Sequence, residues 1–473
     1  MKPETMTHRY VARFELEAVT PVFIGSGESG LLVDALIRSD CNGLPVIPGT
    51  AMAGVLRHSL ESDPGKVEWK SFFGYQDGDE GTGSRLMFSD GLFILNDGKV
   101  IEGAAHELPS DVVALFRNLP VRRHVRIDEK GVADKTGLFD NQVLPAGARF
   151  RCEFLLKGDV SDGDAWGTLI AELGSPRFRL GQGTRKGYGR LKVIGLKERV
   201  FDLRDSEHYR EYLAMDPSLN SEFKGHRPEP ANPSGERTVC YELRLKPDLF
   251  FIFGSGKGER SAGKTADHKP VTEWTFVYGD DGRLRRSAPK TLIPASSLKG
   301  AIAHRVCYHH NRIRKMYVDR GGALKKNEDP AVAYLFGRES SAEQDGGMGE
   351  AGRVFIDDIL IDDSVNDSVF HHVAIDRFTG GVKRGFLFSE QVTNLRRSSD
   401  GLTVRIHIDR ARNPKGIPHD DWERYRQALE DSLKDVCRGL LPLGGMAAKG
   451  HGMFTGELYR DSEKIYSYED DHA

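Results

Sequence analysis

The chain has 473 residues, of which 38% are hydrophobic and 29% are charged, so it is long enough for two or three domains with apolar cores. Its formal net charge of -3 excludes a protein that binds polyanions over its whole surface, although one face can still be basic. The first ten residues are polar and no apolar run is long enough to cross a bilayer. We therefore expect a cytoplasmic protein without a membrane partner.

The chain contains an internal repeat. In chain order, its landmarks are an alternating strand at 10–18 and 238–245, a Phe-Ile-(Phe)-Gly-Ser-Gly turn at 23–27 and 251–256, a helix start at 44–58 and 292–304, a Phe-Gly pair at 72–74 and 335–337, strands at 85–90 and 353–358, a second pair of strands at 124–128 and 372–376, and a glycine-rich loop at 181–190 and 444–452. Seven landmarks that recur in one order indicate a duplicated domain.

The repeat divides the chain into a first domain at 1–200 and a second at 238–465. Residues 201–237 are charged and end in a proline-rich stretch, which is typical of a linker. The acidic tail 466–473 is predicted to be disordered. Strands dominate early in each half, and a helix with apolar residues at helical spacing comes late, as at 420–440. This order predicts an α+β fold with two tandem ferredoxin-like domains.

Both glycine-rich loops come between a predicted helix and the last strand of their half. Such loops bring backbone N–H groups close to a ligand, and cations beside them attract a phosphate backbone. A dinucleotide-binding or P-loop fold is disfavoured, because there the loop follows a strand and precedes a helix. The RNA-binding candidates in these loops are Gly181, Gly183, Arg185, Lys186, Gly187, Gly189 and Arg190 in the first copy, and Gly444, Gly445, Lys449, Gly450 and Gly452 in the second.

The first helix start reads Ile47-Pro-Gly-Thr-Ala-Met-Ala-Gly54, and its counterpart lies at 293–300. Together with the closing glycine loops, these motifs resemble the RAMP superfamily of CRISPR-associated RNA-binding proteins. Each half looks like the repeated backbone subunit of type III (Csm/Cmr-type) effector complexes. The resemblance implies RRM-like domains with inserted β-hairpin thumbs. It also implies a crRNA guide, a target RNA and other effector-complex subunits as partners.

In such backbone subunits an aspartate shortly before the helix start is needed for metal-dependent cleavage of the target. The resemblance places this role on Asp34, in Leu32-Val-Asp-Ala-Leu-Ile-Arg-Ser-Asp40, and on Asp267, in Thr265-Ala-Asp-His-Lys-Pro-Val271. The first copy lacks the proline of the family pattern, and the second has a longer turn at 279–282. A divalent ion, Mg²⁺ or Mn²⁺, is the expected cofactor, and no organic cofactor is expected. On residue type alone, an aspartate in such a turn is more often structural.

The segments after His124 and His372 resemble the hairpin that presses between bases of the guide–target duplex, and a splayed nucleotide is easier to attack in line. The cations expected there are Arg122, Arg123 and Arg126 in the first copy and Arg377, Lys383 and Arg384 in the second, and Arg57 and Lys299 are expected near the helix starts. We expect these side chains to contact phosphates without sequence preference. For any one of them, a solvated surface position is an equally good interpretation.

These features predict a fused double backbone subunit that binds crRNA and cleaves paired target RNA at two sites, acting as a metal-dependent endoribonuclease within a complex. Sequence specificity would come from base pairing with the guide. Two alternatives stay open, a non-catalytic scaffold or capping subunit and a guide-processing RAMP endoribonuclease. Processing enzymes of that kind usually carry one closing glycine loop and one catalytic histidine, so the duplicated loops and aspartates count against the second alternative.

Overall fold

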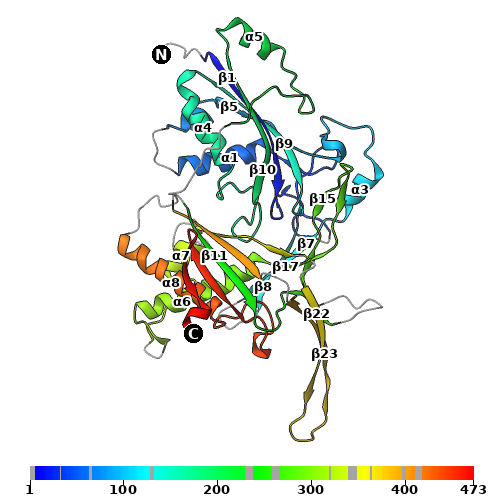
Figure 1. The fold of residues 1–473 in the computed structure, drawn as a ribbon, viewed down its shortest axis with the longest axis vertical. Coiled ribbons are helices and arrows are strands. Elements are labelled where there is room, and N and C mark those ends of the chain that lie inside the picture. Colours follow the sequence, from blue (N-terminus) through cyan, green and yellow to red (C-terminus); the bar gives the residue numbers. More distant parts are fainter. Residues whose placement is uncertain are drawn as a thin grey trace.

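The computed structural model describes residues 6–31, 33–62, 67–127, 133–228, 238–257, 266–318, 321–338, 349–362, 365–396, 401–410 and 418–472. The described residues form two α+β units, one above the other in Figure 1, each with its own apolar core. The predicted α+β class and duplication are confirmed. The finer classification as ferredoxin-like stays a prediction.

The first unit is built on an antiparallel sheet with the order β10-β1-β9-β6-β2, in which β5 also pairs with β9. Alternate residues of β1 are buried against the helices, and Tyr10 packs on Trp166 of α4. The elements of this unit are β1 (His8–Ala18), β2 (Val46–Ile47), α1 (Gly49–Glu61), α2 (Lys70–Phe73), β3 (Tyr75–Asp77), β4 (Glu80–Thr82), β5 (Leu86–Phe88), β6 (Gly91–Phe93), α3 (Ser110–Arg117), β9 (Arg149–Gly158), α4 (Gly163–Glu172) and β10 (Leu191–Asp202).

The second unit repeats this plan with the strand order β20-β24-β11-β25-β26. Its first four strands correspond in order to β5, β9, β1 and β10 of the first unit. Helices α6 and α8 pack together and cover one face of the sheet (Figure 1). The elements are β11 (Thr238–Pro247), α6 (Ala295–Ile313), α7 (Pro330–Phe336), β18 (Gly337–Arg338), β19 (Glu350–Ala351), β20 (Val354–Ile356), β24 (Leu402–Asp409), α8 (His419–Cys437), β25 (Phe454–Arg460), β26 (Glu463–Ser467) and α9 (Tyr468–His472).

Each unit carries one long hairpin at the expected place. In the first unit β7 (Val121–Ile127) pairs with β8 (Ala133–Gln142), and in the second β22 (Val365–Ile375) pairs with β23 (Val382–Leu395). The second hairpin belongs to a sheet with β12 (Gly254–Lys257) and β13 (His268–Pro270), and it projects from the body of the molecule (Figure 1).

A short hairpin of the second half completes the core of the first unit. It consists of β15 (Phe276–Tyr278) and β16 (Leu284–Arg286), which follow β14 (Thr272–Glu273) and precede β17 (Lys290–Ile293), the partner of β21 (Ile359–Ile361). Phe276 and Leu284 are buried in the first core, and the Phe276 N–H donates to the Ala146 carbonyl at 2.8 Å. The boundary in space therefore differs from the boundary along the chain.

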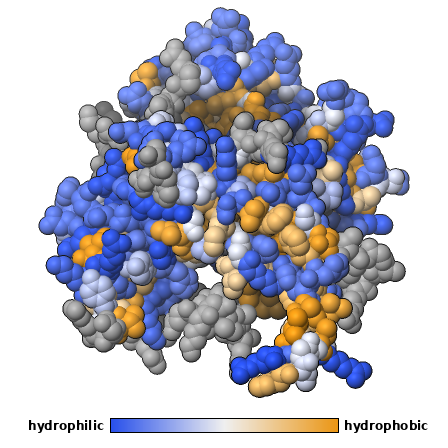
Figure 2. All heavy atoms as spheres, turned by 60° about the horizontal axis from the view of Figure 1, so that its bottom comes forward, coloured by the Kyte–Doolittle hydropathy of each residue, from blue (hydrophilic) through white to orange (hydrophobic). Residues whose placement is uncertain are grey.

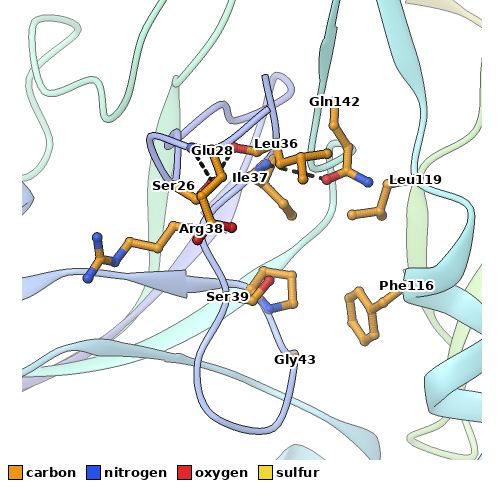
Figure 3. A pocket seen from close by; sticks show the side chains of 11 residues that line it. Ser26, Glu28, Leu36, Ile37, Arg38, Ser39, Gly43, Phe116, Leu119 and Gln142 are labelled. Carbon is orange, nitrogen blue, oxygen red and sulfur yellow. Dashed lines mark hydrogen bonds between the residues drawn. The ribbon is translucent and has the colours of Figure 1, made fainter. Parts of the chain in front are cut away.

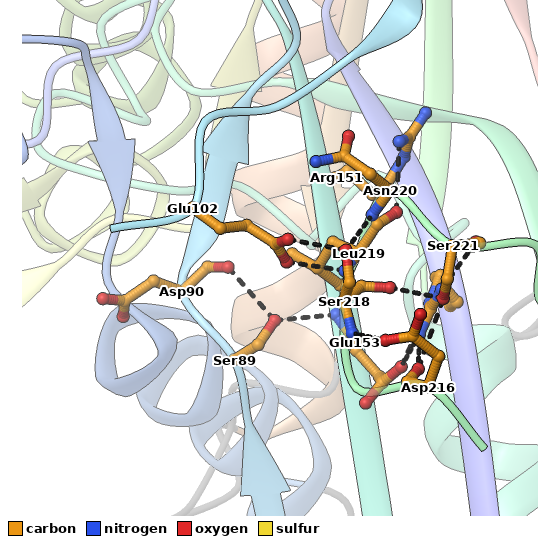
Figure 4. A network of polar contacts seen from close by, with 11 residues as sticks. Ser89, Asp90, Glu102, Arg151, Glu153, Asp216, Ser218, Leu219, Asn220 and Ser221 are labelled. Carbon is orange, nitrogen blue, oxygen red and sulfur yellow. Dashed lines mark hydrogen bonds and ion pairs between the residues drawn. The ribbon is translucent and has the colours of Figure 1, made fainter. Parts of the chain in front are cut away.

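The segments expected to be a linker and a disordered tail contain folded structure. Strand β10 continues to Asp202, α5 (Ser206–Leu213) follows, and Phe223 packs with Phe201 on the outer face of the first sheet. Figure 4 shows residues 216–221 in a polar network on that sheet, in which the Arg13 guanidinium binds both Glu153 and the Ser221 carbonyl. The tail forms the end of β26 and α9, and Tyr466 is buried, so these residues have the apolar contacts that the acidic composition did not predict.

Candidate nucleic-acid interface

The two glycine-rich loops have the same backbone geometry. In the first copy the Gln182 N–H donates to Phe23 O and the Gly189 N–H to Pro21 O, and in the second the Gly445 N–H donates to Ile252 O and the Gly452 N–H to Phe250 O, all at 2.7–2.8 Å. The glycines at 181, 189, 444 and 452 have positive φ angles, between 78° and 94°. A side chain at any of them would meet a backbone carbonyl. Glycine is therefore required at 181 and 444 by the close approach to the turn after the first strand, and at 189 and 452 by the close approach of the two ends of the loop.

The two candidate catalytic aspartates occupy the same place beside the two long hairpins. Asp34 Oδ2 accepts from the Asp140 N–H at 2.9 Å, and Asp140 Oδ1 accepts from the Asp34 N–H at 2.9 Å. In the second copy Asp267 Oδ2 accepts from the backbone N–H and the hydroxyl of Ser389, at 2.9 and 3.0 Å. Both aspartates are exposed. The carboxylates are thus fixed at the base of a hairpin while staying accessible to a large ligand.

Each hairpin base carries a stack of a histidine, a phenylalanine and a loop lysine. In the first copy the His124 ring stacks on Phe139 with centroids 4.8 Å apart, and Lys186 Nζ lies 5.3 Å from the Phe139 centroid. In the second copy His372 stacks on Phe388 at 4.9 Å, and Lys449 Nζ lies 4.1 Å from that ring. The stack joins the glycine loop to the residue that holds the aspartate, because Asp140 and Ser389 directly follow the two phenylalanines.

The histidines of the stacks have different surroundings. Nε2 of His124 lies 2.9 Å from the Tyr188 hydroxyl, and burial together with Lys186 and Arg122 lowers the pKa of His124 to about 4. This ring is therefore neutral at pH 7. His372 instead pairs with the buried Glu390 at 2.6 Å, and His451 of the second loop binds the same carboxylate at 3.0 Å.

Several first-copy cations that we expected to contact RNA form contacts between the two units. Arg122 is buried and pairs with Glu273 at 2.7 Å and with Asp358. Arg190 pairs with Asp357 at 2.6 Å, and the Arg185 guanidinium donates to the Gly352 carbonyl. All of these acceptors belong to the second copy, and the expected RNA contacts of these three arginines stay a prediction.

A group of cations lies where the first glycine loop meets the start of α6. Lys299 Nζ donates to the Phe336 carbonyl at 3.0 Å. Burial and three neighbouring cations, Arg185, Lys186 and Lys326, lower the pKa of Lys299 to about 8. A lysine whose pKa is lowered by neighbouring cations lies in a positive potential, which a bound anion would reduce. We call Arg185, Lys186, Lys299 and Lys326 the junction cluster.

The remaining predicted cations are on the surface. Arg123 is exposed, and Arg57 forms an i,i+4 pair with Glu61 at 3.0 Å. Arg377, Lys383 and Arg384 are exposed near the tip of the β22–β23 hairpin. This hairpin also exposes large apolar side chains, visible at the lower edge of Figure 2: Ile375, Phe378, Val382, Phe386 and Leu387. The side chain of Arg126 lies outside the described residues.

A hollow of about 510 Å³ opens beside the loop of Asp34 (Figure 3). It lies between residues 26–45 and the segment that leads from α3 to β7, and Phe116 and Leu119 form its apolar side. Gln142 spans the gap, since its side-chain oxygen accepts from the Ile37 N–H at 3.3 Å. The lining of the hollow includes residues on both sides of Asp34 in the chain, but not Asp34 itself.

The donor set at the aspartates fits a hard divalent ion only in part. Asp34 and Asp140 bring two exposed or half-exposed carboxylates together, whereas the second site offers the Asp267 carboxylate and the Ser389 hydroxyl. Within the described residues there is no group of three or more potential metal ligands. Mg²⁺ commonly binds to one or two carboxylates and keeps waters and substrate phosphates as its other ligands. The residues present therefore fit a divalent ion only if most of its ligands come from water or from a bound molecule.

The duplicated fold and the paired loops agree with the comparison to protein families. The chain matches the RAMP superfamily over residues 15–192 and 275–455 and belongs to it. No curated protein matches the chain. One similar solved structure is titled "Type III-B Cmr-beta Cryo-EM structure of the Apo state"; the match has 16% identity and a TM-score of 0.31, and covers 39% of this chain and 97% of that one. Among the described residues, no helix is long and apolar enough to span a membrane.

The residues that the sequence analysis missed are Phe139, Asp140, Phe388 and Ser389. Phe139-Asp140 and Phe388-Ser389 stand at matching places in the paired strands, because His124 faces Phe139 and His372 faces Phe388. This match depends on hairpin register, which the sequences of the two hairpins, unequal in length, did not indicate.

Proposed function

We propose that this chain is an RNA-binding backbone subunit of a type III CRISPR effector complex, and that it cleaves target RNA at Asp34 and Asp267. The observation that carries the proposal is the repeated site, in which each copy presents an exposed aspartate bound to the base of a long hairpin. Because duplication would also preserve a structural turn aspartate, the feature that favours chemistry is that both carboxylates stay exposed.

The junction cluster supports RNA as the ligand. RNA phosphates neutralise clustered cations and release counterions, so binding is favoured most where like charges are forced together. Lys186 is exposed, and Lys299 is partly exposed at the start of α6. The His124–Phe139 and His372–Phe388 stacks, in which Phe139 is 43% exposed, are aromatic surfaces beside the loops that a base could extend. Bases stack on such faces irrespective of sequence, which suits a subunit whose specificity comes from a guide.

The aspartates suit cleavage because RNA supplies its own nucleophile. Once the nucleotide is distorted, the ribose 2′-OH attacks the adjacent phosphorus in line and the P–O5′ bond breaks, which leaves a 2′,3′-cyclic phosphate and a 5′-hydroxyl. The protein must therefore orient the phosphodiester, take up the proton of the 2′-OH or neutralise charge, and let the leaving oxygen gain a proton from the protein or from water. Asp34 and Asp267 are held by backbone N–H groups on one oxygen, which fixes their direction. A bound divalent ion would stabilise the charge that develops on the phosphate.

Substitution of both aspartates by asparagine tests the proposal. Asparagine keeps the side-chain oxygen that accepts from Asp140 N–H or Ser389 N–H, so the loops should stay in place while the charge is lost. In the assembled complex, guided cleavage should fall by about 100-fold or more at the corresponding site for Asp34→Asn and Asp267→Asn, the size typical of a general base. Each single variant should remove one of two product bands, and the double variant should remove both.

Matched controls separate charge from position. Asp164→Asn in α4 and Asp420→Asn in α8 remove exposed carboxylates far from the hairpins and should leave both cuts unchanged. If the double variant cleaves like the wild type, the chain is a scaffold or capping subunit. If it still shortens precursor guide RNA when alone, it is a guide-processing nuclease.

A further inference from the structure

The contact between the two copies is made by a set of arginines on the first copy. We call this set, Arg122, Arg177, Arg179, Arg185 and Arg190, the trailing face of the first copy. Its acceptors in the second copy are Glu273, Asp357, Asp358, Asp409 and the Gly352 carbonyl, which we call the leading face. Arg179 and Arg190 share Asp357 at 2.7 and 2.6 Å. Against the cost of burial, they hold the pKa of Asp357 below its ordinary value.

The second copy has its own trailing face, which is identified by backbone register. Leu180 N–H donates to Gly189 O, and Leu443 N–H donates to Gly452 O, so the two loops align without a gap. In the hairpins, Arg122 faces Asn141 just as Phe370 faces Glu390. The equivalents of the five arginines follow from these registers: Phe370 for Arg122, Leu440 for Arg177, Pro442 for Arg179, Ala448 for Arg185 and Met453 for Arg190. All five arginines are thus replaced by uncharged residues.

The leading face of the first copy has also changed. Asp90 accepts from the Gly49 N–H at the start of α1, as Asp358 accepts from the Ala295 N–H at the start of α6, so Asp90 is the equivalent of Asp358. The residue before Asp90 is Ser89 (Figure 4), whereas the residue before Asp358 is Asp357. Lys157 N–H donates to Arg85 O as Asp409 N–H donates to Arg353 O, so Lys157 replaces Asp409. The equivalent of Glu273 is Asp40, which caps its own turn.

We propose that the trailing face of the second copy binds a different polypeptide through apolar contacts, and that this chain does not join head to tail with another copy of itself. In a head-to-tail contact the same surfaces would have to meet again at each junction. Here Met453 and Leu440 would face Ser89 and Lys157, so no ion pair would form and Asp90 would be covered without a cation. Burying a carboxylate without a cation beside it opposes association, and this discriminates against self-assembly.

The exposed residues of this face indicate the chemistry of its partner. Leu440 is 59% exposed and Met453 is 38% exposed, so two apolar side chains face solvent on this surface. At the equivalent positions of the first copy, Arg177 is buried and Arg190 pairs with Asp357. Lys449, the cation of this loop, already lies 3.6 Å from the buried Glu390 of its own copy. The surface is equivalent in backbone register to the one through which the first copy contacts the second. The partner is therefore a protein that presents an apolar patch without an acidic cluster. The inference rests on the duplication alone and does not require RNA cleavage.

Complementary variants test the self-assembly part. Sedimentation should show the wild-type chain as a monomer throughout the micromolar range. A Leu440→Arg, Ala448→Arg, Met453→Arg variant, which restores three arginines, should bind a Ser89→Asp, Lys157→Asp variant at least tenfold more tightly than either binds wild type. Wild-type self-association through these faces would overturn the proposal. So would failure of the two folded variants, checked by circular dichroism, to associate.

Crosslinking tests the partner. A photoreactive amino acid at Met453 should form crosslinks to another polypeptide in the assembly that co-purifies with the tagged full chain from its own cells. The same group at Val160, which is 72% exposed and remote from this face, is the control and should not crosslink to that polypeptide. Crosslinks from Met453 to residues 84–90 of a second copy, or to RNA alone, would overturn the proposal.

Discussion

The sharpest structural prediction concerns Phe276, which belongs to the second half of the sequence and to the core of the first unit. Phe276 is 3% exposed, and its ring lies 5.7 Å from Phe93 and 5.8 Å from Phe116. Replacing a buried phenylalanine by alanine costs about 3–5 kcal/mol. The Phe276→Ala variant should therefore destabilise the first unit, although the substitution lies outside residues 1–237.

Hydrogen exchange locates the effect. A loss of about 4 kcal/mol corresponds to an increase of roughly 1000-fold in the opening equilibrium, because about 1.4 kcal/mol is a factor of ten. The increase should appear at protected amides of β6 and β9, which lie beside Phe276 in the first core. Amides of β11 and β24 in the second core should change much less.

Val277 provides the matched control, since it is the next residue in β15 but is 45% exposed. Val277→Ala should change the unfolding free energy by at most about 0.5 kcal/mol, as is usual for surface substitutions. The reasoning would be refuted if Phe276→Ala left exchange in the first unit unchanged and raised it only within residues 238–472. That result would mean that the hairpin packs with its own half of the sequence.

Three further predictions concern ionisation and charge. Burial and the nearby Arg179 lower the pKa of His407 from its ordinary 6.5 to about 4. As the pH falls, His407 is therefore protonated in the unfolded chain at a higher pH than in the folded protein. The free energy of unfolding should decrease by about 3 kcal/mol between pH 6.5 and 4 for this reason. Urea titrations should show this loss in the wild type and a smaller one in His407→Gln. Lys299→Met should weaken RNA binding and reduce by about one the number of counterions released, as measured by the dependence of the RNA-binding constant on salt concentration. Because the pKa of Lys299 in the free protein is about 8, the affinity of the wild type for RNA should fall between pH 7 and 9, and the variant should lack this fall. Arg57→Ala should change the unfolding free energy by less than about 0.5 kcal/mol, because its pair with Glu61 is half-exposed. A loss of RNA-binding free energy that exceeds this change would therefore indicate that Arg57 contacts a phosphate.

The sequence by itself determined the duplication, the α+β class and the positions of both glycine loops, whereas the two aspartates were singled out by the family resemblance. These features are encoded locally, because a glycine at a positive φ angle, an alternating strand and a helix start each leave a pattern within about ten residues. The repetition of the patterns then supplied the order of the elements.

Only the tertiary structure decided which side chains meet. Arg122 and Arg190 look like RNA-binding cations in the sequence, yet their partners Asp358 and Asp357 lie more than 150 residues away in the second copy. The packing of Phe276 in the first core and the pairing of Asp34 with Asp140 are equally non-local. Such contacts follow from how two folded surfaces fit together, and no pattern within a short window specifies that fit.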